Sequence, residues 1–239
     1  MNIFDAVQKN NLKAVEQLIR EGVDINELGL AVRQKTPLHC VRDNAVAKVL
    51  IAAGADVNAR DLDGNTPLHC TGNFEVIKTL IAAGADTNAK NESGWTPLQH
   101  FVFYDDVERF QALIAAGADV NARDKDGMTP LIYAQSMKTF DALIEAGADV
   151  NALDNDGNTP LHWAGNLERI QALIKAGADP STLNNKGQWP EDRAEGEAQS
   201  ILRETRIAQE KKQLEQDNPQ NLPDRPTPRI SRGECGQLI

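Results

Sequence analysis

Two short motifs recur along this chain with a common period of 30 to 33 residues. Gly-Ala-Asp begins at positions 54, 84, 117, 147 and 177, and Thr-Pro-Leu begins at positions 36, 66, 96, 129 and 159. A period of this length predicts a solenoid, in which each unit buries its apolar side against its neighbours. The repeat therefore outweighs the one or two compact domains that 239 residues would otherwise suggest.

Residues 112–131, ALIAAGADVNARDKDGMTPL, show what one unit contains. The stretch opens with the end of an apolar helix, and Gly117 suits the left-handed residue after it because glycine has no Cβ. Residues 124–127 are typical of a turn. Thr129 can cap the next helix through its hydroxyl, and Pro130 suits the first helical position, where its missing N–H costs nothing.

The motif pair of one unit resembles the ankyrin repeat closely: LIAAGADVNARDLDGN at residues 50–65, followed by TPLH at residues 66–69. The resemblance covers roughly residues 1–205. It implies an all-α solenoid of helix–turn–helix units joined by β-hairpin-like loops, which binds other proteins through the hairpin tips and the concave face. We expect the solenoid to span residues 1–208, with units starting near 1, 36, 66, 96, 129 and 159 and a degenerate cap near 189.

Most units are three residues shorter than the ankyrin pattern, and alignment places the deletion between the two helices. Three residues are close to one helical turn of about 3.6, so the buried faces stay in phase. The unit beginning at Thr96 keeps its full length, which places Phe103 and Tyr104 at its inter-helix turn. Residues 1–26 have one apolar and one polar side, as an N-terminal capping unit requires. Residues 27–35 carry two extra positions and should depart from the regular hairpin.

The C-terminal end of the repeat is degenerate. Trp189-Pro190 stands 30 residues after Thr159-Pro160, where the next Thr-Pro would fall. The second helix of this cap would begin near Glu197 and carries only a thin apolar stripe. Residues 209–239 should comprise a fraying helix and then a disordered tail, because residues 218–239 hold four prolines and little to bury.

The net charge of −10 lies in the repeats, since residues 1–196 hold 18 basic and 28 acidic residues (18 − 28 = −10). An acidic surface repels phosphate, so neither nucleic acid nor an anionic membrane is an expected partner. Three cysteines, an odd number, favour a reducing compartment. The sequence shows no signal peptide and no apolar stretch of 18 residues. We expect a cytoplasmic protein that is monomeric on its own.

No motif supports catalysis, and none predicts a metal or cofactor. The His-Cys pairs at positions 39–40 and 69–70 cannot converge, because adjacent helical residues point about 100° apart. Stacked helices lie roughly 8–10 Å apart, too far to share a zinc ion with bonds near 2.3 Å. The resemblance implies that the His of TPLH is structural. The aspartates of Gly-Ala-Asp occupy turn positions, and phosphate loops and nucleophile elbows are missing from the sequence.

Four residues of the central units are candidates for contact with a partner. The residue before each Thr-Pro is expected at a hairpin tip, where Trp95 and Met128 replace the usual polar residue. Phe103 and Tyr104 fall in the same region, and a group of exposed aromatic side chains favours an interface. The alternative is local packing, with Trp95 on its own hairpin and Phe103 filling space left by the shortened neighbours.

A second candidate is a basic row at one equivalent site on three consecutive hairpins: Arg60, Lys90 and Arg123. Such a row could select an acidic partner segment, or it could be a solvated edge. Together these features predict a non-catalytic protein–protein interaction module. The alternatives are a bacterial effector or inhibitor, exported through its arginine-bearing tail to occupy a host or competitor protein, and an enzyme, for which no site is present.

Overall fold

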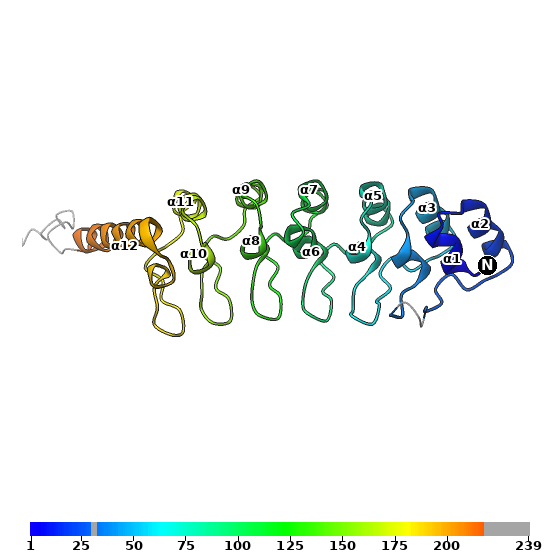
Figure 1. Cartoon of the computed structure of the whole chain (residues 1–239), viewed down its shortest axis with the longest axis horizontal. Helices are drawn as coiled ribbons and strands as arrows, with labels where there is room; N and C mark the ends of the chain where they lie inside the picture. The colour runs from blue at the N-terminus through cyan, green and yellow to red at the C-terminus, as the bar shows by residue number, and fades with distance from the viewer. Residues whose placement is uncertain (30–32, 218–239) are drawn as a thin grey trace, which may run out of the picture.

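The computed structural model describes residues 1–29 and 33–217, which form a single row of stacked helix pairs (Figure 1). The expected disordered tail, residues 218–239, lies outside the described residues. The first helices of the pairs are α1 (Ile3–Gln8), η2 (Pro37–Cys40), α4 (Pro67–Cys70), α6 (Pro97–Phe103), α8 (Pro130–Tyr133), α10 (Pro160–Trp163) and η3 (Pro190–Arg193). The second helices are α2 (Leu12–Arg20), α3 (Asn44–Ala52), α5 (Phe74–Ala82), α7 (Val107–Ala115), α9 (Met137–Glu145), α11 (Leu167–Lys175) and α12 (Gly196–Gln216).

The helices form two layers, with a loop projecting from each unit on the side of the first helices (Figure 1). From α1 to η3, each first helix contacts the first helix of the next unit. We call the face formed by these loops and the first helices the inner face. This arrangement confirms the predicted all-α solenoid.

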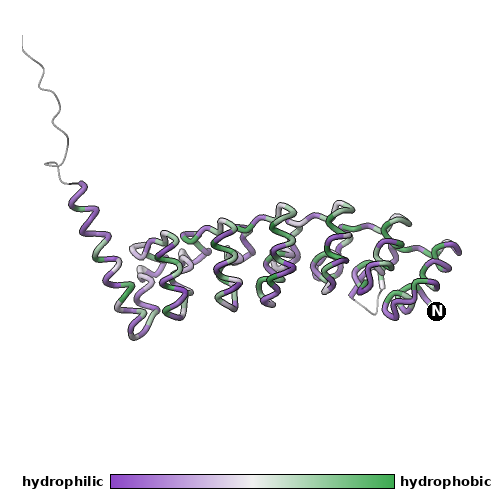
Figure 2. The backbone as a smooth tube through the Cα atoms, turned by 90° about the horizontal axis from the view of Figure 1, so that it is seen from above, coloured by the Kyte–Doolittle hydropathy of each residue, from purple (hydrophilic) through white to green (hydrophobic). Residues whose placement is uncertain are grey.

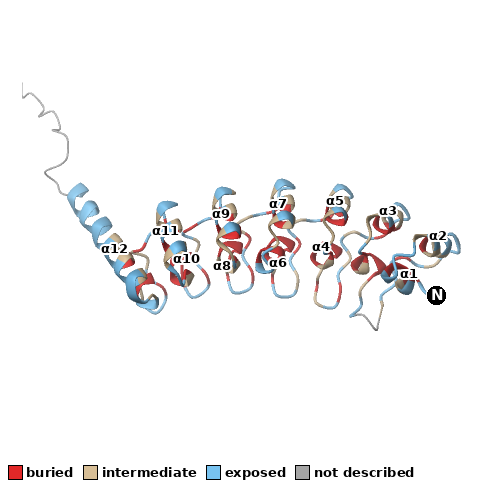
Figure 3. Ribbon diagram, turned by 45° about the horizontal axis from the view of Figure 1, so that its top comes forward, coloured by how far each residue is buried: buried red, intermediate tan, exposed pale blue. Residues whose placement is uncertain are grey.

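The buried residues gather where the two layers face each other (Figure 3). The leucine of every Thr-Pro-Leu is buried, and each second helix from α3 to α11 contributes one fully buried leucine, from Leu50 to Leu173. Each buried leucine is worth roughly 1.5–3 kcal/mol of transfer free energy. The core is therefore a row of equal contributions along the stack, without a single centre.

The expected helix ends are present, with one exception. Gly117 has a φ of +86°, the left-handed conformation that glycine adopts without strain. Pro130 opens α8. The hydroxyl of Thr129 does not cap that helix, however, and has no hydrogen-bond partner among the described residues although it is buried. The prediction of this cap was wrong. The hydroxyls of the equivalent Thr36, Thr66 and Thr159 contact the histidine three residues later, and Thr129 has no such partner because this unit carries Ile132.

The expected hairpin-like loops are present from unit to unit, and the described residues form no β-strand, only one isolated bridge between Gly29 and Lys35. An Asp or Asn side chain opens each regular loop. Asp61, for example, accepts the backbone N–H groups of Asp63 and Asn65 at 3.0 and 2.8 Å. Neighbouring loops are joined by a backbone bond, such as Glu92 N–H to the Asp63 carbonyl at 2.8 Å. The loops are thereby held at a fixed spacing.

The length difference predicted between units is confirmed in the first helices. α4, α8 and α10 have four residues each, whereas α6 has seven. The extra turn of α6 brings Phe103 to its last position and Tyr104 to its C-cap. The irregular first loop is also confirmed, since Arg33 and Gln34 both adopt positive φ there.

The degenerate cap ends the stack with a long helix. Figure 2 shows α12 leaving the row at an angle, with mainly hydrophilic residues along its outer part. Glu191 of η3 is buried and accepts Nε and Nη2 of Arg206, each at 3.0 Å, which fixes α12 to the last unit. In the described ranges, no helix combines the length and the apolar character that crossing a bilayer requires.

Candidate functional site

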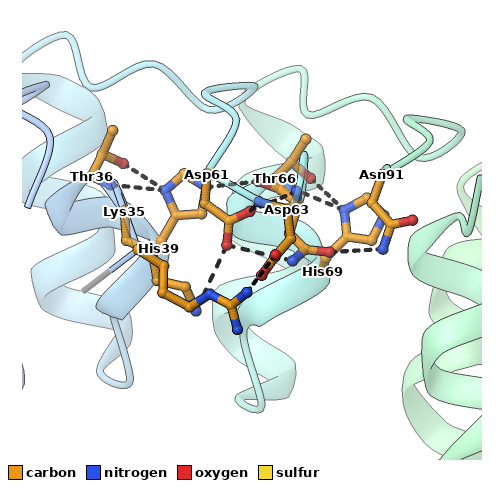
Figure 4. A network of polar contacts seen from close by, with 10 residues as sticks. Lys35, Thr36, His39, Asp61, Asp63, Thr66, His69 and Asn91 are labelled. Atoms are coloured by element: carbon orange, nitrogen blue, oxygen red, sulfur yellow. Dashed lines mark hydrogen bonds and ion pairs between the residues drawn. The ribbon is translucent and has the colours of Figure 1, made fainter. Parts of the chain in front are cut away.

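The histidines of Thr-Pro-Leu-His connect neighbouring units (Figure 4). The backbone N–H of Thr36 donates to Nδ1 of His39 at 3.1 Å, and His39 Nε2–H donates to the Asn65 carbonyl at 2.9 Å. His69 repeats this pattern with Thr66 and Trp95, at 3.1 and 3.0 Å. A carbonyl can only accept and a backbone N–H can only donate, so the neutral Nε2–H tautomer is required.

Burial and this bonding pattern hold the imidazoles neutral. Burial lowers the pKa of His69 to about 4 and lowers the pKa of His39 and His162 as well. Neither nitrogen of these rings is free for a metal or a proton relay. The expected structural role of these histidines follows from their contacts.

The first helix of each repeat carries one further side chain of interest. It is the residue that directly follows the histidine, or that follows the equivalent position in the units without a histidine, and we call this set the column. Its members are Cys40, Cys70, His100, Tyr133, Trp163 and Arg193. The prediction from sequence included none of these six as site residues, since it considered Cys40 and Cys70 only in the His-Cys pairs that it rejected as a metal site. An alignment of the fifth residue of each unit, counted with the threonine of Thr-Pro as the first, would have shown that thiols in the early units give way to large aromatic rings in the later ones.

An aromatic cluster occupies the middle of this column, where the long α6 lies. The Trp95 ring lies 5.3 Å from the Phe103 ring and 4.9 Å from the Tyr133 ring, measured between centroids. Phe103 contacts Tyr104 edge-on at 5.3 Å, and Tyr104 contacts His100 at 4.9 Å. We call these five residues the aromatic cluster.

The members of the cluster differ in exposure. Trp95 and Tyr133 are half-buried, whereas Phe103 is 39% exposed and Tyr104 is 66% exposed. Trp95 therefore packs between Phe103 of α6 and Tyr133 of α8, whereas the local-packing alternative placed it on its own hairpin. It supports Phe103, which in turn contacts the exposed Tyr104. Such a platform can bind an apolar side chain without first rearranging.

Two contacts with the next unit hold this platform in place. The hydroxyl of Tyr133 donates to Asp124 Oδ2 at 2.5 Å, and burial together with this bond raises the pKa of Tyr133. Asp105, which follows Tyr104 and has a φ of +59°, accepts the hydroxyls of Ser136 and Thr139 at 2.6 and 2.5 Å. These hydrogen bonds lower the pKa of Asp105, so its carboxylate stays ionised while it ties the long turn to α9.

Met128 lies on the next hairpin and is half-buried. Its carbonyl accepts Nε2 of Gln99 at 3.0 Å, and its N–H donates to Asp124 at 2.9 Å. The ring contacts of the cluster join Trp95 to Phe103 and Tyr133, and Phe103 to Tyr104. Met128 takes part in the site through its backbone.

The basic row has intramolecular partners. Nη2 of Arg60 donates to the Lys90 carbonyl, Nζ of Lys90 to the Arg123 carbonyl at 2.8 Å, and Nη1 of Arg123 to the Leu153 carbonyl. All three side chains are exposed. Each therefore links its hairpin to the next, and the suggestion that the row also contacts an acidic partner stays a prediction.

The N-terminal end of the column contains a cavity of about 480 Å³ next to Cys40 and Cys70. Burial raises the pKa of both thiols, which are therefore protonated at neutral pH and poor nucleophiles. In residues 1–29 and 33–217, no three His, Cys, Asp or Glu side chains are grouped so that they could hold a metal ion.

Comparison with known proteins identifies the fold family. A family profile described as "Ankyrin repeats (3 copies)" matches residues 3–91, 70–154 and 102–184, most of the stack. The chain is an ankyrin repeat protein. Among solved structures it is similar to the ankyrin repeat domain of Bcl-3, described as a unique member of the IkappaB protein family. That match has 30% sequence identity and a TM-score of 0.77, and covers 84% of this chain and 97% of the other. Comparison with curated proteins found no match.

Ankyrin repeat domains are in general protein–protein interaction modules, and the inner face supplies what such a module needs here. The loops are spaced by backbone hydrogen bonds, and the first helices present one side chain per unit in a regular column. The aromatic cluster adds two exposed rings, Phe103 and Tyr104, beside the middle of this column.

Proposed function

We propose that this ankyrin repeat protein binds a partner protein by seating an apolar side chain of that partner on Phe103 and Tyr104. The observation that carries the proposal is the exposure of these two rings, 39% and 66%. Phe103 rests on Trp95 and Tyr133, and Tyr104 rests on His100 and Phe103. Aromatic residues exposed beside one another are enriched at the centres of interfaces.

The platform is preorganised, which favours binding. Trp95 is fixed between two rings, and Tyr133 is fixed by its hydrogen bond to Asp124. Little side-chain entropy remains to be lost when a partner arrives, and that loss otherwise costs about 0.5–1.5 kcal/mol per side chain. Asp105 and Asp106 follow Tyr104 directly, which is compatible with a partner segment that carries positive charge beside its apolar residue.

The test compares three forms of the full chain as bait in a quantitative affinity capture from the native lysate. The parent and the variant Leu62→Ala, which removes an exposed side chain from a different hairpin, should capture the same proteins. The double variant Phe103→Ala, Tyr104→Ala should lose one or more of them. For a captured partner, truncating such anchors should weaken binding at least about tenfold.

Circular dichroism of each variant provides the control for folding. Both rings end at the surface, so their removal should leave the helical signal in place. If the double variant is folded and captures the same proteins with the same affinity as the parent, the aromatic cluster is not the binding site.

A further inference from the structure

A second site lies at the C-terminal end of the inner column, in the last complete unit and the cap. It is a cavity of about 220 Å³ whose lining is mainly polar. The lining includes Asn158, Trp163, Asn184, Lys186, Gln188 and Arg193. We call this cavity the Arg193 pocket. It shares no residue with the aromatic cluster.

Arg193 is held in one orientation. Its guanidinium lies 4.5 Å from the centre of the Trp163 ring, a cation–π contact, and Nη1 donates to Asn158 Oδ1 at 3.1 Å. Trp163 is itself fixed, because its Nε1–H donates to Asp154 Oδ2 at 2.9 Å. The planar face of the guanidinium is thereby set by the indole beneath it.

The amides behind Arg193 are buried and linked to each other. Asn158 and Asn184 are only 3% and 7% exposed. Asn158 Nδ2 donates to Asp154 Oδ2 at 3.0 Å, and Asn184 Nδ2 donates to Asn158 Oδ1 at 2.8 Å. Buried polar groups that satisfy each other in this way make a rigid wall.

The pocket carries positive charge without a paired acid. Among the described residues, no ion pair joins Arg193 or Lys186 to a carboxylate. Asp156 also lines the cavity, so the charged side chains of the lining sum to +1 (2 − 1). The Asp154 carboxylate lies behind this lining, where it accepts the N–H groups of Trp163 and Asn158. A guanidinium presents several N–H donors in one plane, and the ligand that matches this pattern is a planar carboxylate.

We propose that the Arg193 pocket binds a carboxylate group of a peptide, supplied by an acidic side chain or by a chain end. Arg193 and Lys186 provide the charge, and the rigid wall of amides and indole keeps Arg193 in place. The equivalent positions nearer the N-terminus carry thiols at Cys40 and Cys70, so this chemistry belongs to the last units.

The experiment uses the full chain labelled with ¹⁵N and follows the indole N–H signals of its three tryptophans. The signal of Trp163 is assigned with the variant Trp163→Phe. Four probes are titrated at constant ionic strength. N-acetyl-aspartate N-methylamide represents a side-chain carboxylate, and N-acetylglycine represents a chain end. N-acetyl-asparagine N-methylamide is the neutral match, and inorganic phosphate is the alternative anion.

At least one carboxylate probe should shift the Trp163 signal saturably, with a dissociation constant of about 1–10 mM, as is usual for so small a ligand. The probe that binds more tightly identifies the source of the carboxylate. Arg193→Gln should weaken this binding at least about tenfold, because hydrogen bonds to charged groups are among the strongest. Arg20→Gln, with the same charge change on α2 at the far end of the stack, should leave it unchanged.

Four results would overturn the proposal. They are the lack of any saturable shift, an equal shift with the neutral probe, phosphate binding without carboxylate binding, and undiminished binding by Arg193→Gln. If Arg193→Gln loses helical signal, Lys186→Gln takes its place, since Lys186 is exposed and its ammonium makes no ion pair among the described residues.

Discussion

Replacing one buried histidine by glutamine should reduce the acid sensitivity of the stack without weakening it at neutral pH. His69 links Thr66 to Trp95 as a neutral ring. The unit beginning at Thr96 makes the same link with Gln99, whose Oε1 accepts Thr96 N–H at 3.0 Å and whose Nε2 donates to the Met128 carbonyl at 3.0 Å. Glutamine can therefore replace the imidazole at this position and does not titrate.

The magnitude follows from the pKa of His69. It is about 4 in the folded chain because of burial, and about 6.5 in an unfolded chain. The unfolded state therefore binds more protons between these values, and the free energy of unfolding falls as pH is lowered through this window. Between pH 7 and pH 5 the loss from His69 alone should be about 2 kcal/mol, from roughly 1.36 kcal/mol per pH unit.

The assay is urea unfolding followed by far-ultraviolet circular dichroism, at pH 7 and pH 5 and at constant ionic strength. The other buried histidines and the carboxylates contribute equally to parent and variant. The stability lost between the two pH values should therefore be about 2 kcal/mol smaller in His69→Gln than in the parent. The reciprocal variant Gln99→His should become more sensitive to acid than the parent. Equal losses in all three proteins would refute the reasoning.

Two further predictions concern the contacts between units. Gly94 and Gly84 both have positive φ, but a Cβ at Gly94 would lie 2.7 Å from the Lys125 backbone N, whereas one at Gly84 would meet open space. In urea or thermal unfolding, Gly84→Ala should lower the free energy of unfolding by about 1–2 kcal/mol through conformational strain alone. Gly94→Ala should lower it further because of the added steric clash. Equal losses in the two variants would contradict the tight packing of these hairpins. In the cap, Arg206→Ala should cost about 3 kcal/mol and increase amide exchange in α12, because it leaves Glu191 buried without its main partner. Arg203→Ala should cost less than about 1 kcal/mol, since its side chain is 68% exposed against 12% for Arg206; a similar loss in both would argue against the burial of this ion pair.

The sequence by itself determined the fold and most of its local geometry. The period of the two motifs and the longer α6 are confirmed, as are the left-handed glycine after the second helices α2 to α11 and the proline at the start of the first helices η2 to η3. These features could be predicted because each depends on the conformational preference of a residue and its close neighbours in the chain. The candidate rings Phe103 and Tyr104 were found in the same way, from the one unit that keeps its full length.

Only the tertiary structure decided which side chains meet between units. The sequence could not show that Trp95 packs against Tyr133, about 40 residues away, or that Arg193 lies over Trp163. It also could not show that the guanidinium of Arg60 donates a hydrogen bond to a backbone carbonyl of the next hairpin. These contacts depend on the spacing and rotation of one unit against the next, which the packing of the whole stack fixes, and a repeat pattern describes each unit without that relation.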